Sequence, residues 1–223
     1  MTAKRLLPTS DERAMREAVI GTALAMNSAG INRGKSGNVS ARLDAGFLIT
    51  PTGIPYDAMT PDDIVAMTLD GVARGDRAPS SEWRFHRDLY RAREEFHAIV
   101  HVHAPFATTL ACVRRGIPAF HYMVATAGGR DIRCAPYATF GSPELAALAV
   151  AAMADRGACL LANHGMIAAG RDLAGALALA IEVEGLAEMY WRALQIGEPA
   201  LLSDAEMDAV LGKFLTYGQP ARD

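Results

Sequence analysis

The chain has 223 residues, 51% hydrophobic and 21% charged, which is an ordinary globular composition. Its formal net charge of −3 argues against a general nucleic-acid-binding protein, which usually carries a basic excess. No stretch reaches the ~18 apolar residues that a membrane span needs, and the first residues lack the apolar segment of a secretion signal. We therefore expect a cytoplasmic protein that binds neither nucleic acid nor membranes and folds as one domain over residues 1–223.

The first half of the chain predicts one helix, then short strands and a second helix. Ser10 fits the N-cap of a helix that runs to about Asn27, because Asp11 and Glu12 suit its positive end. A glycine-rich stretch at 30–37 follows. The later elements are a strand at 47–50, a helical turn at 60–64, a strand at 64–71, a helix at 80–93 capped by serine and a strand at 98–104.

The second half is mainly helical, with two short strands. The expected elements are a helix from Pro105 to Arg114, a helix from Ser142 to about Gly157, two strands over 159–170, a long helix over 173–196 and a last helix over 204–218. Strands and helices do not alternate strictly, so the pattern favours an α/β fold with a central, largely antiparallel sheet covered by helices.

Three histidines stand where strands are expected. His101 and His103 flank Val102, so their side chains share one face of a strand, with Cα atoms roughly 6.5 Å apart. The pair alone is consistent with a metal site or with two hydrogen-bonded core histidines. His164 lies where an apolar strand meets a glycine, and three nitrogens with one open position are the pattern of a catalytic zinc site.

Small hydrogen-bond donors suggest where an anion could bind. Backbone N–H groups beside glycine can approach a phosphate closely, and a helix N-terminus adds a favourable dipole. Taken singly, each of these segments could equally be an ordinary turn or cap. The candidate phosphate segments are Gly37-Asn38, Thr52-Gly53 and Ser80-Ser81.

Glu82 and His86 are four residues apart and therefore share a helix face. His86 could orient Glu82 or simply pack in the core, and packing is the favoured interpretation.

A family resemblance runs along nearly the whole chain. The segments GNVSAR, LITPTGIPYDAMTPDDIV, PSSEWRFH, IVHVHAPFAT, IPAFHYMVATAGG, CAPYATFG, NHGMIA and KFLTYG together resemble the class II aldolase/adducin family, most closely its bacterial L-fuculose-phosphate aldolases. The resemblance implies a three-layer α/β/α fold and a cyclic homotetramer with active sites shared between subunits. It also implies a zinc ion on His101, His103 and His164, joined by Glu82 in the resting site. Manganese, cobalt or iron could replace zinc on such ligands.

The resemblance also implies roles for further residues. Glu82 would be the acid/base, and Tyr122 would reach in from the neighbouring subunit as a proton donor. Asn163 departs from the fuculose enzymes, which carry a second histidine there, so the sugar is less certain than the chemistry. The implied phosphate-binding residues are Asn38, Thr52, Gly53, Ser80 and Ser81, and the implied aldehyde pocket is Phe140, Phe214 and Tyr217.

The expected reaction is cleavage of a ketose 1-phosphate, most of all L-fuculose 1-phosphate, to dihydroxyacetone phosphate and L-lactaldehyde. A Schiff-base mechanism needs a desolvated lysine, and Lys4, Lys35 and Lys213 all stand in polar or glycine-rich segments. A metal must therefore stabilise the developing charge. The alternatives are an aldolase for 5-deoxyribulose or 5-methylthioribulose 1-phosphate, an epimerase, a methylthioribulose-1-phosphate dehydratase and a non-catalytic adducin-like scaffold. The epimerases carry aspartate at the position of Glu82, and a scaffold needs no complete set of histidines.

Overall fold

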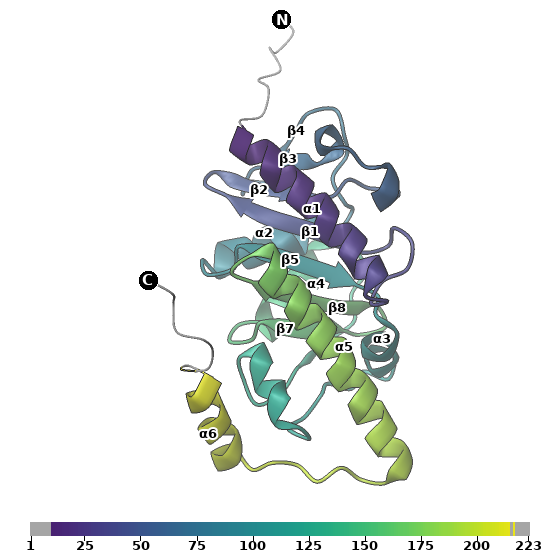
Figure 1. Cartoon of the computed structure of the whole chain (residues 1–223), viewed down its shortest axis with the longest axis vertical. Helices are drawn as coiled ribbons and strands as arrows, with labels where there is room; N and C mark the ends of the chain where they lie inside the picture. Colours follow the sequence, from purple (N-terminus) through teal and green to yellow (C-terminus); the bar gives the residue numbers. More distant parts are fainter. Residues whose placement is uncertain (1–9, 215, 217–223) are drawn as a thin grey trace, which may run out of the picture.

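A single eight-stranded sheet forms the centre of the molecule (Figure 1). The computed structural model describes residues 10–214 and 216. The strands are β1 (Asn38–Leu43), β2 (Gly46–Ile49), β3 (Val65–Met67), β4 (Ala73–Arg74), β5 (Ala98–Val102), β6 (Cys134–Ala135), β7 (Ala158–Leu161) and β8 (Gly165–Gly170). Their order is β4-β3-β2-β1-β5-β8-β7-β6, and every neighbouring pair is antiparallel except β6 and β7. The expected antiparallel sheet is thus confirmed, with one parallel edge.

Helices cover both faces of this sheet. They are α1 (Ser10–Ser28), α2 (Trp83–Ala92), α3 (Pro105–Cys112), α4 (Pro143–Ala152), α5 (Leu173–Ile196) and α6 (Asp204–Phe214), with 3₁₀ turns η1 (Tyr56–Ala58), η2 (Pro61–Asp63) and η3 (Tyr122–Ala127). Figure 1 shows α1 and α5 side by side across one face. None of the helices in the described residues is both long and apolar enough to cross a membrane.

Two separate hydrophobic clusters explain the layers. In β5, Val100 and Val102 belong to the cluster that includes α1 and α5, whereas Ile99 belongs to the cluster of α2 and α4. Adjacent strand residues point to opposite faces, so the apolar run of β5 supplies both clusters. The fold is therefore the expected α/β/α arrangement.

Several predicted boundaries were wrong. Helix α2 begins at Trp83, not Ser80, because Ser80 Oγ accepts the backbone N–H of Glu82 (3.3 Å) in a turn that precedes the helix. Strand β5 ends at Val102, so His103 lies just beyond it. The strand expected at 64–71 covers only Val65–Met67. Helix α4 ends at Ala152 and not near Gly157. Helix α6 is described to Phe214, and most of the rest of the predicted range 204–218 lies outside the described residues.

Strand register positions the polar residues at one end of the sheet. Asn38 pairs with His101 between β1 and β5. Val102 pairs with Met166 between β5 and β8, so the turn at 162–164 that precedes β8 lies beside the residues that follow β5. His103 and His164 are therefore brought together although 61 positions separate them.

Helix α3 begins at Pro105, two residues after His103, and is anchored by a carboxylate from α5. Glu184 accepts the backbone N–H groups of Phe106 and Ala107, each at 2.8 Å, and burial raises the pKa of this carboxyl.

We expect Glu184→Ala to lower the free energy of unfolding by about 2–4 kcal/mol, since two buried donors lose their partner. Chemical denaturation measures the change. Glu182→Ala in the same helix is the control and should cost under about 0.5 kcal/mol; equal losses would contradict the anchoring role.

Candidate metal centre

Four side chains from three segments converge at this end of the sheet. Glu82 precedes α2, His101 lies in β5, His103 follows it, and His164 ends the turn between β7 and β8. One ligand atom of each lies within 4.8 Å of the others. Glu82 Oε2 is 3.0 Å from His101 Nε2, Glu82 Oε1 is 3.1 Å from His164 Nε2, and the Nε2 atoms of His101 and His103 are 3.2 Å apart.

The donor atoms fit a tetrahedral cation. Zinc bonds of about 2.0–2.1 Å give a tetrahedron with edges of about 3.3–3.4 Å, close to the separations found. His101 Nδ1 lies 2.9 Å from the Met166 carbonyl oxygen and can only donate to it, so Nε2 faces the cluster and offers its lone pair to a cation once the ring has given up the proton that Glu82 favours. Glu82 Oε1 is buried and, apart from its ion pair with His164, has no hydrogen-bond partner among the described residues. A divalent cation would satisfy this set of lone pairs.

The electrostatics of the four groups are strongly coupled. Burial raises the pKa of Glu82, but the adjacent His101 and His164 more than offset this and hold it well below its usual range. Burial, together with the charge of His101 and His164, lowers the pKa of His103 to about 4. Glu82 is therefore a carboxylate and His103 a neutral imidazole near neutral pH, which are the protonation states that a metal ligand requires.

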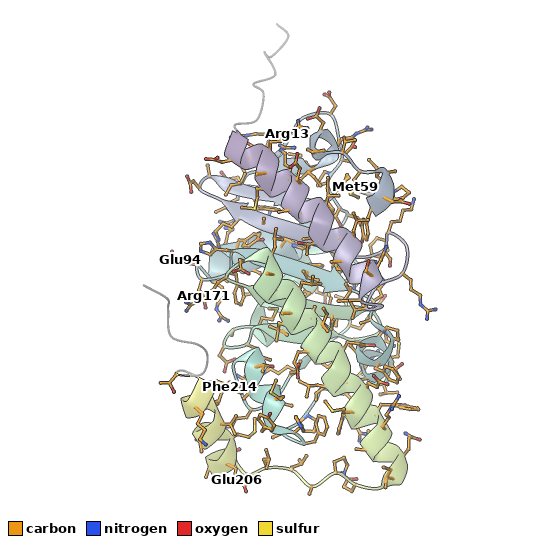
Figure 2. All side chains as sticks on the ribbon, viewed as in Figure 1. Arg13, Met59, Glu94, Arg171, Glu206 and Phe214 are labelled. Carbon is orange, nitrogen blue, oxygen red and sulfur yellow. The ribbon has the colours of Figure 1, made fainter. Side chains whose placement is uncertain are left out.

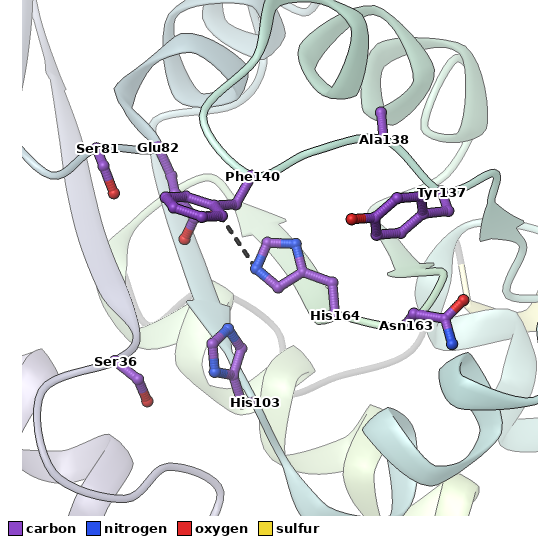
Figure 3. Close-up of a pocket in the computed structure, with 9 residues that line it drawn as sticks. All are labelled: Ser36, Ser81, Glu82, His103, Tyr137, Ala138, Phe140, Asn163 and His164. Atoms are coloured by element: carbon purple, nitrogen blue, oxygen red, sulfur yellow. Dashed lines mark ion pairs between the residues drawn. The ribbon is translucent and has the colours of Figure 1, made fainter.

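A cavity of about 300 Å³ opens beside the cluster (Figure 3). Glu82, His103 and His164 line it, whereas His101 is fully buried and does not. The remaining lining residues are Ser36, Ser81, Tyr137, Ala138, Phe140 and Asn163. In Figure 3 the Tyr137 hydroxyl points toward His164, and the Phe140 ring lies near Glu82. A small polar molecule in this cavity can thus contact three of the four candidate ligands.

Of the candidate phosphate segments, Ser80-Ser81 is the one that contributes a lining residue to this cavity. Ser80 N donates to the Thr50 carbonyl and Thr52 N to that of Ala78, so the segments at 50–53 and 78–81 run side by side. Ser81 lines the cavity, as does Ser36 from the glycine-rich stretch, whereas Thr52 and Gly53 are exposed and are not among its lining residues.

Two phosphate candidates have other partners. Ser80 is buried, and its hydroxyl is used in the turn before α2. Asn38 is also buried, and its Nδ2 donates to Glu82 Oε2 at 3.0 Å. Sequence reasoning dismissed Lys35, yet its Nζ lies 2.6 Å from the Gly53 carbonyl and places a positive charge near these segments.

The candidate aldehyde residues are only partly brought together. Phe140 lines the cavity with a side chain that is 65% exposed. Phe214 ends α6, which packs on η3, and does not line the cavity (Figure 2). Tyr217 lies outside the described residues. Tyr122 begins η3, is 51% exposed and is also absent from the cavity lining of this single chain.

Tyr137 and His86 were missed or undervalued. Tyr137 stands in the segment CAPYATFG, from which sequence reasoning selected only Phe140. His86 does not simply pack: its ring nitrogens contact Asn38 and Ser40. The four-residue spacing between Glu82 and His86 indicated that the two side chains share a helix side. It could not identify the partners of His86, because Asn38 and Ser40 lie on β1.

Comparison with known proteins agrees with this geometry. The family model for the class II aldolase and adducin N-terminal domain matches residues 17–191. The 5-methylthioribulose-1-phosphate/5-deoxyribulose-1-phosphate aldolase of Rhodospirillum rubrum is 55% identical over 94% of this chain and 95% of its own length. The L-fuculose phosphate aldolase of Escherichia coli K12 is 49% identical over 90% of this chain and 94% of its own length. A solved L-fuculose 1-phosphate aldolase superposes with a TM-score of 0.88 at 40% identity, covering 94% and 98% of the two chains. The chain therefore belongs to the class II aldolase and adducin family, as a class II aldolase.

Proposed function

We propose that this protein is a zinc-dependent aldolase that cleaves 5-deoxyribulose 1-phosphate or 5-methylthioribulose 1-phosphate to dihydroxyacetone phosphate and an aldehyde. The observation that carries the chemistry is the group formed by Glu82, His101, His103 and His164 at the mouth of a small cavity. The relative named for this pair of substrates is 55% identical, against 49% for the L-fuculose phosphate aldolase. L-Fuculose 1-phosphate, the substrate that the sequence motifs favour, is therefore the second candidate.

The residues around the cavity have separate roles in the proposed reaction. A zinc ion on the three imidazoles supplies Lewis-acid stabilisation of the negative charge that develops as the C3–C4 bond breaks. Ser36 and Ser81 on the rim, with Asn38 behind them, offer donors to the phosphate. Glu82, displaced by the substrate, takes up a proton from solvent and delivers it to C3 of the three-carbon fragment.

Tyr122 of a neighbouring subunit accepts the proton of the C4 hydroxyl while its own phenol proton passes to solvent, and the C4 oxygen becomes the aldehyde oxygen. The exposure of Tyr122 and its absence from the cavity of its own chain support this role. The proposal thus includes a homotetramer with shared sites and a cytoplasmic location, as the family resemblance implies.

The composition of the cavity wall favours a substrate whose tail, the part released in the aldehyde, carries no hydroxyl group. Tyr137, Ala138 and Phe140 present mainly apolar surface. Asn163 Oδ1 accepts Arg114 Nε, and Asn163 Nδ2 donates to the Cys112 carbonyl, both at 3.2 Å, so the asparagine amide is already engaged. A methyl or methylthiomethyl tail loses no hydrogen bond against such a wall, whereas a hydroxylated tail would leave its own group poorly paired.

The test is release of dihydroxyacetone phosphate from 5-deoxyribulose, 5-methylthioribulose and L-fuculose 1-phosphates, with and without a chelator. We expect kcat/KM to be at least about tenfold higher for the two substrates without a tail hydroxyl. Chelator should stop the release, and added zinc should restore it. The highest kcat/KM on L-fuculose 1-phosphate would reverse the order of the candidates, and full release by metal-free protein would overturn the aldolase mechanism. Asn163→His is the matched variant and should move the ratio toward L-fuculose 1-phosphate.

A further inference from the structure

A buried chain of polar side chains runs from the candidate metal centre into the layer between the sheet and α2. Glu82 Oε2 lies 3.0 Å from Asn38 Nδ2, and Asn38 Oδ1 lies 2.5 Å from His86 Nε2. His86 Nδ1 lies 2.7 Å from Ser40 Oγ, which lies 2.7 Å from the Tyr90 hydroxyl. The four residues behind Glu82 are each at most 2% exposed, so water does not compete for these contacts.

Two regular spacings produce this chain. Asn38 and Ser40 are two apart on β1 and point to the same face of the sheet. His86 and Tyr90 are four apart on α2, and Glu82 is four residues before His86, so the three lie along one side of the helix. The helix side lies against the strand face, and polar groups alternate between the two elements from the core to the cavity.

The direction of every hydrogen bond in the chain is fixed. The Glu82 carboxylate can only accept, so the Asn38 NH₂ faces it and the Asn38 oxygen faces His86. That oxygen can only accept, so His86 carries its hydrogen on Nε2. Burial, with the charge of His101, lowers the pKa of His86 to about 3, so the ring is neutral and Nδ1 accepts. Ser40 therefore donates to His86, and Tyr90 donates to Ser40.

This order opposes rotation of the Asn38 amide. If the amide turned by half a turn, its oxygen would face the carboxylate of Glu82 and its NH₂ would face the N–H of His86. Both contacts would be repulsive, and two buried donors would lose their acceptors. The orientation of Asn38 at the cavity therefore depends on His86, which itself contacts none of the candidate ligands through a hydrogen bond.

We propose that His86 is a positioning residue, which holds the Asn38 NH₂ toward the cavity so that it supports Glu82 in the resting site and the substrate phosphate once Glu82 has moved. The role of the phosphate rests on the proposed function, whereas the support of Glu82 does not. Ser40 and Tyr90 complete the arrangement by selecting the His86 tautomer.

His86→Asn and His86→Gln form a matched pair for the test. Both are neutral amides that remove the ring, but the NH₂ of glutamine reaches the position of Nε2 and that of asparagine does not. In His86→Asn we expect zinc to be lost to a chelator about tenfold faster, because partners of metal ligands typically contribute 10–100-fold to metal affinity. We also expect calorimetry on the zinc-loaded protein to show about tenfold weaker binding of dihydroxyacetone phosphate. His86→Gln should retain most of both properties.

An Asn38→Ala background separates positioning from a general structural role. If His86 acts through Asn38, His86→Asn should change zinc loss by less than about twofold in this background. Equal damage by both His86 variants, an undiminished effect in Asn38→Ala, or no effect of His86→Asn in the natural chain would each overturn the proposal. If the His86 variants do not fold, Ser40→Ala replaces them, and unchanged zinc loss there would also overturn it.

The rate of zinc loss and the binding of dihydroxyacetone phosphate distinguish a failure of this proposal from a failure of the proposed function. Failure to cleave any ketose 1-phosphate would remove the phosphate role, while the rate of zinc loss would still test the support of Glu82. The exposed His97 provides a control, since His97→Asn should leave both readouts unchanged.

Discussion

Replacement of His103 by alanine is expected to prevent stoichiometric zinc binding and to lower kcat/KM by about a thousandfold, since the metal's stabilisation of the transition state is worth several kcal/mol. The variant removes one of the three imidazole nitrogens of the cluster, which lies 3.2 Å from His101 Nε2. His103 is the preferred position because its side chain borders the cavity, whereas His101 is fully buried and its loss would also damage the core. Metal analysis after dialysis and steady-state assays with the best ketose 1-phosphate measure the two effects.

The same experiment needs a histidine that lies away from the site. His97 is exposed in the connection before β5, so His97→Ala should bind zinc and turn over as the natural chain does. Thermal melting of His103→Ala shows whether the fold is intact. Full zinc content with undiminished turnover in that variant would exclude His103 as a ligand.

Glu82→Gln is expected to retain zinc on the three imidazoles but to lose about 10²–10⁴-fold in kcat, the usual contribution of a general acid–base group. Glutamine keeps the size of the side chain, and its amide oxygen can still accept the hydrogen bond from Asn38. It cannot carry the proton to C3. Metal content and kcat are compared with Glu94→Gln, a change at an exposed glutamate that should alter neither. Full activity of Glu82→Gln would remove this residue from the mechanism.

Mixed subunits extend this test to the neighbouring chain. Glu82→Gln and Tyr122→Phe should each be nearly inactive alone, because each lacks one of the two proton-transfer groups. If the sites are shared in a cyclic oligomer, equal mixing should restore both groups in about a quarter of the sites. Mixed oligomers that regain no activity would count against a catalytic role for Tyr122 across the interface.

Local sequence patterns predicted the central elements better than the edges of the fold. The β-branched run before Pro105 predicts β5, and the long helix expected over 173–196 has the observed bounds of α5. Strands β4 and β6 have two residues each and carry no detectable periodicity. They form only because a neighbouring strand offers hydrogen bonds, and this depends on tertiary contacts.

The start of α2 shows why a capping signal can mislead. Ser80 followed by Ser81 and Glu82 resembles a helix N-terminus in sequence. The Ser80 backbone N–H instead donates to the Thr50 carbonyl, which holds the segment beside residues 50–53. Helix α2 therefore begins three residues later, and Glu82, the residue just before it, contacts His101.

The sequence by itself determined the family, the α/β class and the chemical identity of the candidate ligands, because imidazole and carboxylate groups in these motifs have few other combined uses. Only the tertiary structure decided that His164 meets His103, since the β5–β8 register sets that contact and no local pattern encodes it. The same holds for His86, whose partners lie on a different strand. Short-range geometry follows from neighbouring residues, whereas the meeting of distant side chains follows from how strands pair and layers stack.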